Sequence, residues 1–157
     1  MGTLPQRKNI RLRNYDYSKP GHYFVTICTH NMQNLLGEVV GSGPDVAPYV
    51  RLSNIGTQVE VNLLKLPEIH AGIVVKPYVV MPNHIHFIMQ LTGRHGDLAL
   101  PELVGRFKSY TTKLYADILW QRSYYERVIR NEKEHLAICE YIQTNPLRWE
   151  LDRYYKK

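Results

Sequence analysis

Two histidines, His84 and His86, carry the pattern most suggestive of chemistry, and they lie inside the apolar run HIHFIMQL. Alternate side chains of a strand point to the same face, so both imidazoles project together, roughly 7 Å apart along the strand. Two imidazoles placed in this way can bind one divalent metal ion. The pair therefore predicts a metal site, and the alternative of two core histidines satisfied by hydrogen bonds stays open.

A second candidate lies near the end of the chain, in a segment with helical periodicity. Tyr141 and Asn145 are one turn apart and share a helix face with Ile138 and Ile142. The isoleucines should turn that face toward a sheet. A phenol can act as a nucleophile, and an amide oxygen one turn away could reach a metal. The chain has 12 tyrosines, so an ordinary core tyrosine remains the alternative.

Strands are expected where β-branched and aromatic residues alternate. These segments are residues 22–30, 72–80, 84–91 and a short piece within 121–130. Pro77 predicts a bulge or an edge position in the second of them. LLGEVV and PYVRL flank the Gly/Pro-rich loop 41–47, and this pattern predicts a β-hairpin.

Three helices are expected from apolar spacing. The first should begin near Ile55 after the capping pair Ser53-Asn54 and end at Pro67. The second should begin near Pro101 and present a strict apolar stripe of Leu100, Leu103, Phe107, Tyr110 and Leu114. The last should begin at Asn131, with Glu134 completing a capping-box pattern, and run to about Asn145 before Pro146.

This order of elements predicts an α+β fold with a ferredoxin-like β-α-β-β-α-β core and an antiparallel sheet. A hairpin is inserted after the first strand, and the C-terminal helix carries Tyr141. We expect one domain over residues 1–157, in which residues 1–20 form a basic N-terminal arm.

The formal net charge of +6 favours a polyanionic partner, nucleic acid above all, although a solvated basic surface has the same composition. Single strands bind to cationic surfaces that carry aromatic stacking platforms. The candidate DNA contacts are in the arm, namely Arg7, Lys8, Arg11 and Arg13, and on or after the second helix, namely Arg106, Lys108, Lys113 and Arg122.

The cellular compartment is indicated by the absence from the sequence of features that exported and membrane proteins carry. There are two cysteines, without a C-x-x-C pair, and no apolar run of about 20 residues or signal-peptide pattern. We expect a protein of the cytoplasm, associated with the nucleoid when it is bound to DNA.

Several of these segments together resemble one known family. Met81-Pro82-Asn83-His84-Ile85-His86 resembles the HUH motif of single-tyrosine transposases (the transposase IS200-like family). Residues 121–131, residues 140–146 and the opening segment 15–26 resemble the matching parts of REP-associated tyrosine transposases, in the same order. The resemblance covers nearly the whole chain.

The resemblance implies a ferredoxin-like nuclease and strand transferase that acts on single-stranded DNA, often at hairpin-forming repeats. By this match His84 and His86 are metal ligands and Tyr141 is the nucleophile. Asn145 stands where related transposases commonly place a glutamine ligand. The family uses Mg²⁺ or Mn²⁺ and is often dimeric, so a homodimer is expected.

Two other functions remain possible on the residues alone. A hydrolase could use zinc-bound water, but no third histidine or acid is evident from spacing. A non-catalytic, nucleic-acid-binding ferredoxin-like module would need neither metal nor nucleophile. For the nucleophile's general base, His135 is the one weak candidate.

Overall fold

A four-stranded antiparallel sheet forms the centre of this computed structural model, which describes residues 15–41 and 44–157. Its strands lie in the order β4-β5-β1-β6. They are β1 (Gly21–Cys28), β4 (Ile73–Met81), β5 (His84–Leu91) and β6 (Tyr125–Ile129). A separate hairpin pairs β2 (Gly37–Val40) with β3 (Tyr49–Leu52). The helices are α1 (Asn54–Ile69), α2 (Leu100–Tyr115) and α3 (Glu132–Gln143).

The predicted ferredoxin-like core is confirmed by the connectivity. The chain runs β1-α1-β4-β5-α2-β6, and the two central strands of the sheet are β5 and β1. The β2–β3 hairpin is inserted between β1 and α1, and α3 follows the core. Two short 3-10 turns, His30–Met32 and Trp149–Leu151, complete the regular structure.

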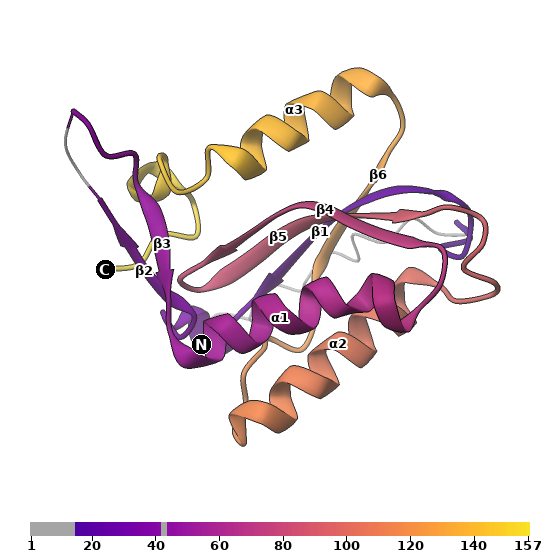
Figure 1. The fold of residues 1–157 in the computed structure, drawn as a ribbon, viewed down its shortest axis with the longest axis horizontal. Helices are drawn as coiled ribbons and strands as arrows, with labels where there is room; N and C mark the ends of the chain where they lie inside the picture. Colours follow the sequence, from indigo (N-terminus) through magenta and orange to yellow (C-terminus); the bar gives the residue numbers. More distant parts are fainter. Residues whose placement is uncertain (1–14, 42–43) are drawn as a thin grey trace, which may run out of the picture.

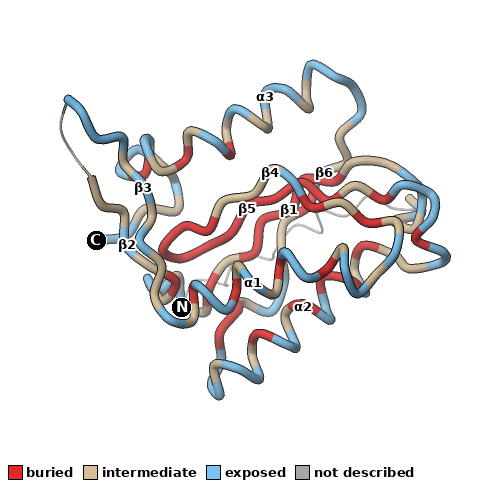
Figure 2. The backbone as a smooth tube through the Cα atoms, viewed as in Figure 1, coloured by how far each residue is buried: buried red, intermediate tan, exposed pale blue. Residues whose placement is uncertain are grey.

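The helices lie on both faces of the sheet. Figure 1 shows α1 and α2 together on one face and α3 across the other. Ile85, Phe87 and Met89 of β5 belong to the large core cluster on the α1 and α2 side, whereas Ile88 packs with Ile142 of α3. The central strands are almost entirely buried (Figure 2). Strand alternation therefore turns His84 and His86 toward α3.

Pro77 has the predicted effect on β4. The pairing register between β4 and β5 shifts between Val75 and Tyr78, and β4 lies at the edge of the sheet. Both outcomes follow from the missing N–H of proline, which cannot take part in the ladder.

The prediction that Pro67 ends the first helix is wrong. α1 continues to Ile69, and the backbone N–H of His70 still donates to Leu66 O at 2.9 Å. A proline removes only its own N–H, so near a helix end one hydrogen bond is lost and the last turn closes behind it.

The predicted apolar stripe of α2 is also wrong in its second half. Tyr110 and Leu114 are 52% and 55% exposed. Thr111 lies inward instead, where its hydroxyl donates to Phe107 O and accepts a 2.8 Å hydrogen bond from the indole N–H of Trp120. The apolar pattern did not reveal Thr111, a polar residue that can be buried because it has hydrogen-bond partners.

Other boundaries differ by a few residues. β1 ends at Cys28 rather than at residue 30, and α3 ends at Gln143 rather than near Asn145. The predicted hairpin is confirmed, although residues 42–43 of its loop lie outside the described residues. The first 14 residues of the predicted arm lie outside them as well. Within the described chain, no helix is long and apolar enough to cross a membrane.

Candidate active site

The two histidines of β5 lie side by side on the face covered by α3. His84 is 0% exposed and His86 is 1% exposed. Their ring centroids are 4.5 Å apart, closer than the strand repeat alone would place them, because the rings lean toward each other. His86 pairs in register with Thr26 of β1, and His84 pairs with Cys28.

Hydrogen bonds orient both imidazoles through Nδ1. His84 Nδ1 lies 2.8 Å from Oδ1 of Asn83. The amide nitrogen of Asn83 donates to the carbonyls of Met32 and Tyr154, so its oxygen must accept from His84. That bond places the proton of neutral His84 on Nδ1. His86 Nδ1 lies 2.7 Å from the Thr26 hydroxyl.

The other ring nitrogens are the atoms that could bind a metal. Nε2 of His84 and Nε2 of His86 are buried and have no hydrogen-bond partner among the described residues. Metal-bound histidines commonly hold their second nitrogen in a hydrogen bond of the kind seen at Asn83 and Thr26. Both imidazoles therefore have the arrangement that a metal ligand requires.

Burial keeps both rings neutral. It lowers the pKa of His84 to about 4, although the nearby Asp152 carboxylate acts in the opposite direction. Burial also lowers the pKa of His86 well below its ordinary value, and the proximity of His84 and Arg153 adds to the effect. At neutral pH the rings carry no proton on the ligand nitrogen, so no proton has to leave before a cation binds.

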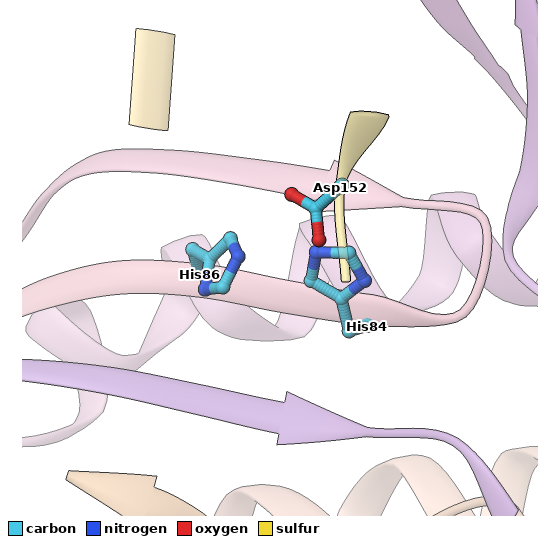
Figure 3. A group of neighbouring side chains, drawn as sticks. All are labelled: His84, His86 and Asp152. Atoms are coloured by element: carbon cyan, nitrogen blue, oxygen red, sulfur yellow. The ribbon is translucent and has the colours of Figure 1, made fainter. Parts of the chain in front are cut away.

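The C-terminal segment brings a carboxylate to the histidines. Ligand atoms of His84, His86 and Asp152 all lie within 4.8 Å of one another. Figure 3 shows the carboxylate of Asp152 reaching toward the two rings of β5 from a separate part of the chain. The backbone N–H of Tyr154 donates to Asp152 Oδ1 at 2.8 Å and so aims the carboxylate. Two imidazoles and a carboxylate form a donor set suited to a divalent metal such as Mn²⁺.

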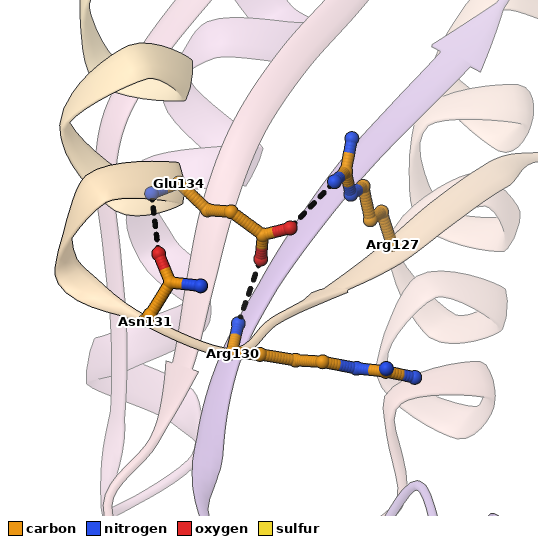
Figure 4. Close-up of polar contacts among 4 residues, drawn as sticks. All are labelled: Arg127, Arg130, Asn131 and Glu134. Carbon is orange, nitrogen blue, oxygen red and sulfur yellow. Dashed lines mark hydrogen bonds and ion pairs between the residues drawn. The ribbon is translucent and has the colours of Figure 1, made fainter.

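The start of α3 is anchored to β6 by a small polar cluster (Figure 4). Oδ1 of Asn131 accepts from the backbone N–H of Glu134 at 2.8 Å, as the capping prediction required. The Glu134 carboxylate accepts from the side chain of Arg127 at 2.5 Å and from the backbone N–H of Arg130 at 3.0 Å. Among the described contacts, the Glu134 carboxylate does not accept from the backbone N–H of Asn131. The second hydrogen bond of the predicted capping box is therefore replaced by the bonds to Arg127 and Arg130. These bonds set the direction of α3 across the sheet.

Helix α3 places Tyr141 over the histidines. Ile142 is buried against Phe24 and Ile88, which holds the predicted helix face on the sheet. The Tyr141 ring lies 5.2 Å from the His86 ring between centroids. Its hydroxyl donates to Asp152 Oδ2 at 3.3 Å. Burial, together with the nearby Asp152 carboxylate, raises the pKa of Tyr141 to about 12.

Asn145 lies just after the last turn of α3 and is 1% exposed. Its amide nitrogen donates to Asp152 Oδ2 at 3.2 Å. Its oxygen, Oδ1, is buried without a partner among the described residues. The Asn145 side chain thus donates to Asp152 and has an oxygen that could bind a metal.

Aromatic rings close the site. The Tyr154 ring lies 4.5 Å from the ring of His84 and 5.7 Å from that of His86. Phe24 stacks on His86 at 5.4 Å, and the Trp149 ring lies 6.1 Å from that of His84. These rings explain why the ligand nitrogens are inaccessible to water in this arrangement of the C-terminal segment.

The predicted DNA contacts that lie within the described residues are not gathered around this cluster. Arg106 and Lys113 are exposed on α2, which lies across the sheet from α3. The ammonium of Lys108 donates to the carbonyls of Gln121 and Arg122, at 2.7 and 3.2 Å. Arg122 is exposed in the segment that leads to β6. Arg7, Lys8, Arg11 and Arg13 lie outside the described residues.

Sequence reasoning missed three residues of the site and weighed one that lies elsewhere. Asp152, Asn83 and Thr26 had no assigned role, although Asn83 directly precedes the histidine motif. The ring of His135 lies against that of His22, 5.0 Å away, while the Tyr141 hydroxyl meets Asp152. Among the described residues, the Tyr141 hydroxyl is therefore hydrogen-bonded to Asp152 and not to His135.

Comparisons with known proteins identify two similar sequences. An uncharacterized protein of Haemophilus influenzae is 33% identical over 97% of this chain and 94% of its own length. A second Haemophilus influenzae protein, named as a putative REP-associated tyrosine transposase, is 28% identical over 44% of this chain and 47% of its own. No protein-family model matches.

Two solved structures share the fold. One is a REP-associated tyrosine transposase bound to a REP hairpin, with a TM-score of 0.64 and 23% identity over 88% of this chain and 73% of the other. The second is a transposase, so named provisionally, from Deinococcus radiodurans R1, with a TM-score of 0.51 and 15% identity over 85% of this chain and 97% of the other.

Proposed function

This chain belongs to the same family as the 33% identical Haemophilus influenzae protein and resembles REP-associated tyrosine transposases in sequence and fold; we propose that it nicks and rejoins single-stranded DNA through Tyr141. The relationship supports a transposase-like, DNA-processing role in general. The tyrosine mechanism and the metal dependence are our proposals.

The proposal rests on four functional groups that lie close together. The Tyr141 hydroxyl, the Asp152 carboxylate and the unpartnered Nε2 atoms of His84 and His86 come from three separate segments and meet in one place. A structural core would gain nothing from burying two imidazole nitrogens without partners, since an unpaired buried polar atom costs free energy. A bound cation would satisfy them.

The chemistry follows from these groups. The Tyr141 oxygen attacks a backbone phosphorus, a new P–O bond to tyrosine forms, and the bond to one sugar oxygen breaks. The phenol gives up its proton and the departing sugar oxygen takes one, so the charges balance. Because the phosphotyrosine conserves the energy of the broken bond, the reverse attack rejoins the strand without ATP.

His84, His86 and Asp152 would hold the metal, with the unused oxygen of Asn145 as a further ligand. When bound, such a cation offsets charge on the phosphate oxygens and orients the scissile group. Imidazole ligands favour Mn²⁺ over Mg²⁺, which prefers oxygen. Asn83 and Thr26 position the two imidazoles, and the aromatic rings around them exclude water.

We propose hairpin-forming repeat DNA with single-stranded flanks as the substrate. The solved relative is bound to a REP hairpin, and the net charge of +6 suits a polyanion. The predicted cations of the arm and of α2 remain candidate contacts with the DNA. We further propose one domain over the chain, a cytoplasmic, nucleoid-associated location and a homodimer, which sedimentation analysis would test.

The test is a search for the covalent product. Labelled hairpins with single-stranded flanks are incubated with the protein and Mn²⁺, and the mixture is run on a denaturing gel. We expect a labelled protein band that chelator abolishes. Binding of the same DNA with no adduct under any metal condition would contradict the proposal and favour the non-catalytic module.

The zinc hydrolase alternative gains one observation, because Asp152 supplies the third ligand that the spacing did not reveal. It predicts cleavage without a covalent product and full activity in Tyr141→Phe. The binding-module alternative gains none, since the helices cover both faces of the sheet (Figure 1).

A further inference from the structure

A groove of about 740 Å³ lies beside the candidate site, between the β2–β3 hairpin and the C-terminal segment. Its walls include Arg51 of the hairpin, Trp149 and Tyr155, and the last two residues, Lys156 and Lys157. Figure 1 shows the C-terminal segment running next to this hairpin. The groove lies outside the candidate metal cluster of His84, His86 and Asp152.

The groove adjoins the metal ligands through one ring. Trp149 lines the groove, and its ring lies 6.1 Å from that of His84 on the other side. Pro82, two residues before His84, also lines it. A chain lying in the groove would therefore be separated from His84 by one side chain, Trp149.

The charge of the groove is positive. Arg51 is paired with Glu38 across the hairpin, so these two offset each other. Lys156 and Lys157 are exposed and form no ion pair among the described residues. The groove thus presents two lysine side chains that no side-chain carboxylate of the described residues pairs with.

Hydrogen bonds hold the C-terminal segment in place. Asn34 donates to Lys156 O at 3.1 Å, and the amide of Asn83 donates to Tyr154 O at 2.6 Å. The ammonium of Lys156 donates to Asn31 O at 3.3 Å. The backbone that bears the two lysines is therefore held by hydrogen bonds. The side chain of Asn83 bonds both to this backbone and to His84.

The groove also offers aromatic surface. Tyr155 packs edge-on against Trp149, with centroids 5.2 Å apart, and Tyr155 is half-buried. Proteins bind single strands by combining cationic grooves with aromatic rings on which unpaired bases stack. Duplex DNA keeps its bases stacked inside and cannot use such rings.

We propose that this groove binds the single-stranded flank of the DNA substrate and leads it to Tyr141. Lys156 and Lys157 contact the phosphates, and Tyr155 stacks with an unpaired base. This inference relies on the proposed function for the identity of the substrate, and it adds the region that distinguishes a flanked hairpin from a blunt one.

Equilibrium binding without metal tests the groove separately from catalysis. A hairpin with a single-stranded thymidine flank is compared with the same hairpin without it, over a range of salt concentrations. We expect Lys156→Gln/Lys157→Gln to lose the extra affinity that the flank confers. The slope of log K against log salt should fall by about 0.7 for each lost phosphate contact. Lys65→Gln/Lys76→Gln removes the same charge elsewhere and should change nothing.

The stacking contact has its own pair of variants. Tyr155→Ala should weaken binding of the flanked hairpin about tenfold, the cost of one lost base-aromatic stack, while Tyr155→Phe should keep it. An equal loss on the blunt hairpin would show that the groove contacts duplex, and an unchanged flank effect in the lysine variant would show that it contacts no DNA. Either result overturns the proposal.

Failure of the groove and failure of the proposed function give different results. If the wild-type protein forms the covalent adduct but the flank effect is insensitive to the lysines, the groove is wrong and the nicking function stands. If the flank effect depends on the lysines but no adduct forms in Mn²⁺, the groove is correct and the catalytic proposal fails.

Discussion

The Tyr141 hydroxyl donates a hydrogen bond to Oδ2 of Asp152 across 3.3 Å, and this contact joins α3 to the C-terminal segment. The same oxygen accepts from Asn145. The proposed nucleophile, the proposed third ligand and the neighbouring amide are therefore one polar unit above His84 and His86.

Replacing Tyr141 with phenylalanine should stop covalent attachment of DNA and leave the fold intact. Only the hydroxyl is removed and no cavity forms, but the hydrogen bond to the Asp152 carboxylate is lost, so the free energy of unfolding should fall by about 1 to 3 kcal/mol. Peptide mapping of the wild-type adduct identifies the attached residue, and exposed Tyr110, changed to phenylalanine, is the control. A phosphotyrosine at Tyr124, Tyr125 or elsewhere would refute the assignment of the nucleophile while leaving the reaction class in place.

The variants His84→Ala and His86→Ala should each abolish cleavage and keep DNA affinity within about twofold, because neither neutral ring contributes a phosphate contact. Cleavage is followed on labelled hairpins in Mn²⁺, and affinity is measured in chelator at low salt. His70→Ala, at the end of α1, is the matched control. Lost binding with retained cleavage would rule out the ligand role.

Asp152→Asn should weaken Mn²⁺ binding while preserving the fold. The amide oxygen can still accept from the backbone N–H of Tyr154, but the negative charge that attracts the cation is gone. The rise in melting temperature on adding Mn²⁺ should shrink, and manganese spectroscopy should show weaker binding. Exposed Glu150→Gln removes a charge two residues away and should leave Mn²⁺ binding unchanged; equal losses in the two variants would argue against a ligand role for Asp152.

Stability of the metal-free protein should fall as the pH drops from about 6.5 to about 4. The unfolded chain binds a proton at His84 with a pKa near 6.5, whereas burial holds the folded value at about 4. The unfolded state therefore binds more protons in this window, and folding loses roughly 3 kcal/mol by its lower end. Urea denaturation at a series of pH values measures this, and His84→Gln should reduce the loss. A flat profile between these limits would contradict the depressed pKa.

Deleting residues 1–14 should weaken DNA binding and flatten its salt dependence. This segment carries Arg7, Lys8, Arg11 and Arg13 and lies outside the described residues, so the expectation comes from sequence alone. Each phosphate contact on a single strand contributes about −0.7 to the slope of log K against log salt. An unchanged slope would mean that the arm makes no phosphate contact.

The local periodicity of the sequence by itself determined which residues share a face of each strand and helix. The two-residue repeat of a strand was sufficient to place His84 and His86 on one face of β5, and the helical repeat to group Tyr141 with Ile142. The order of these segments also indicated the ferredoxin-like core. Such features depend on neighbours in the chain, which is why they can be predicted from it.

Only the tertiary structure decided what faces the histidines. Asn83 and Tyr154 are hydrogen-bonded although they are 71 residues apart, and that contact helps to place Asp152 in the site. Nothing in the local pattern of the C-terminal segment distinguishes Asp152 from exposed Glu150. The same reason explains Thr111, which lies inward because Trp120 supplies its partner. A polar residue is buried where a distant group satisfies it, and that group can be identified only once the chain has folded.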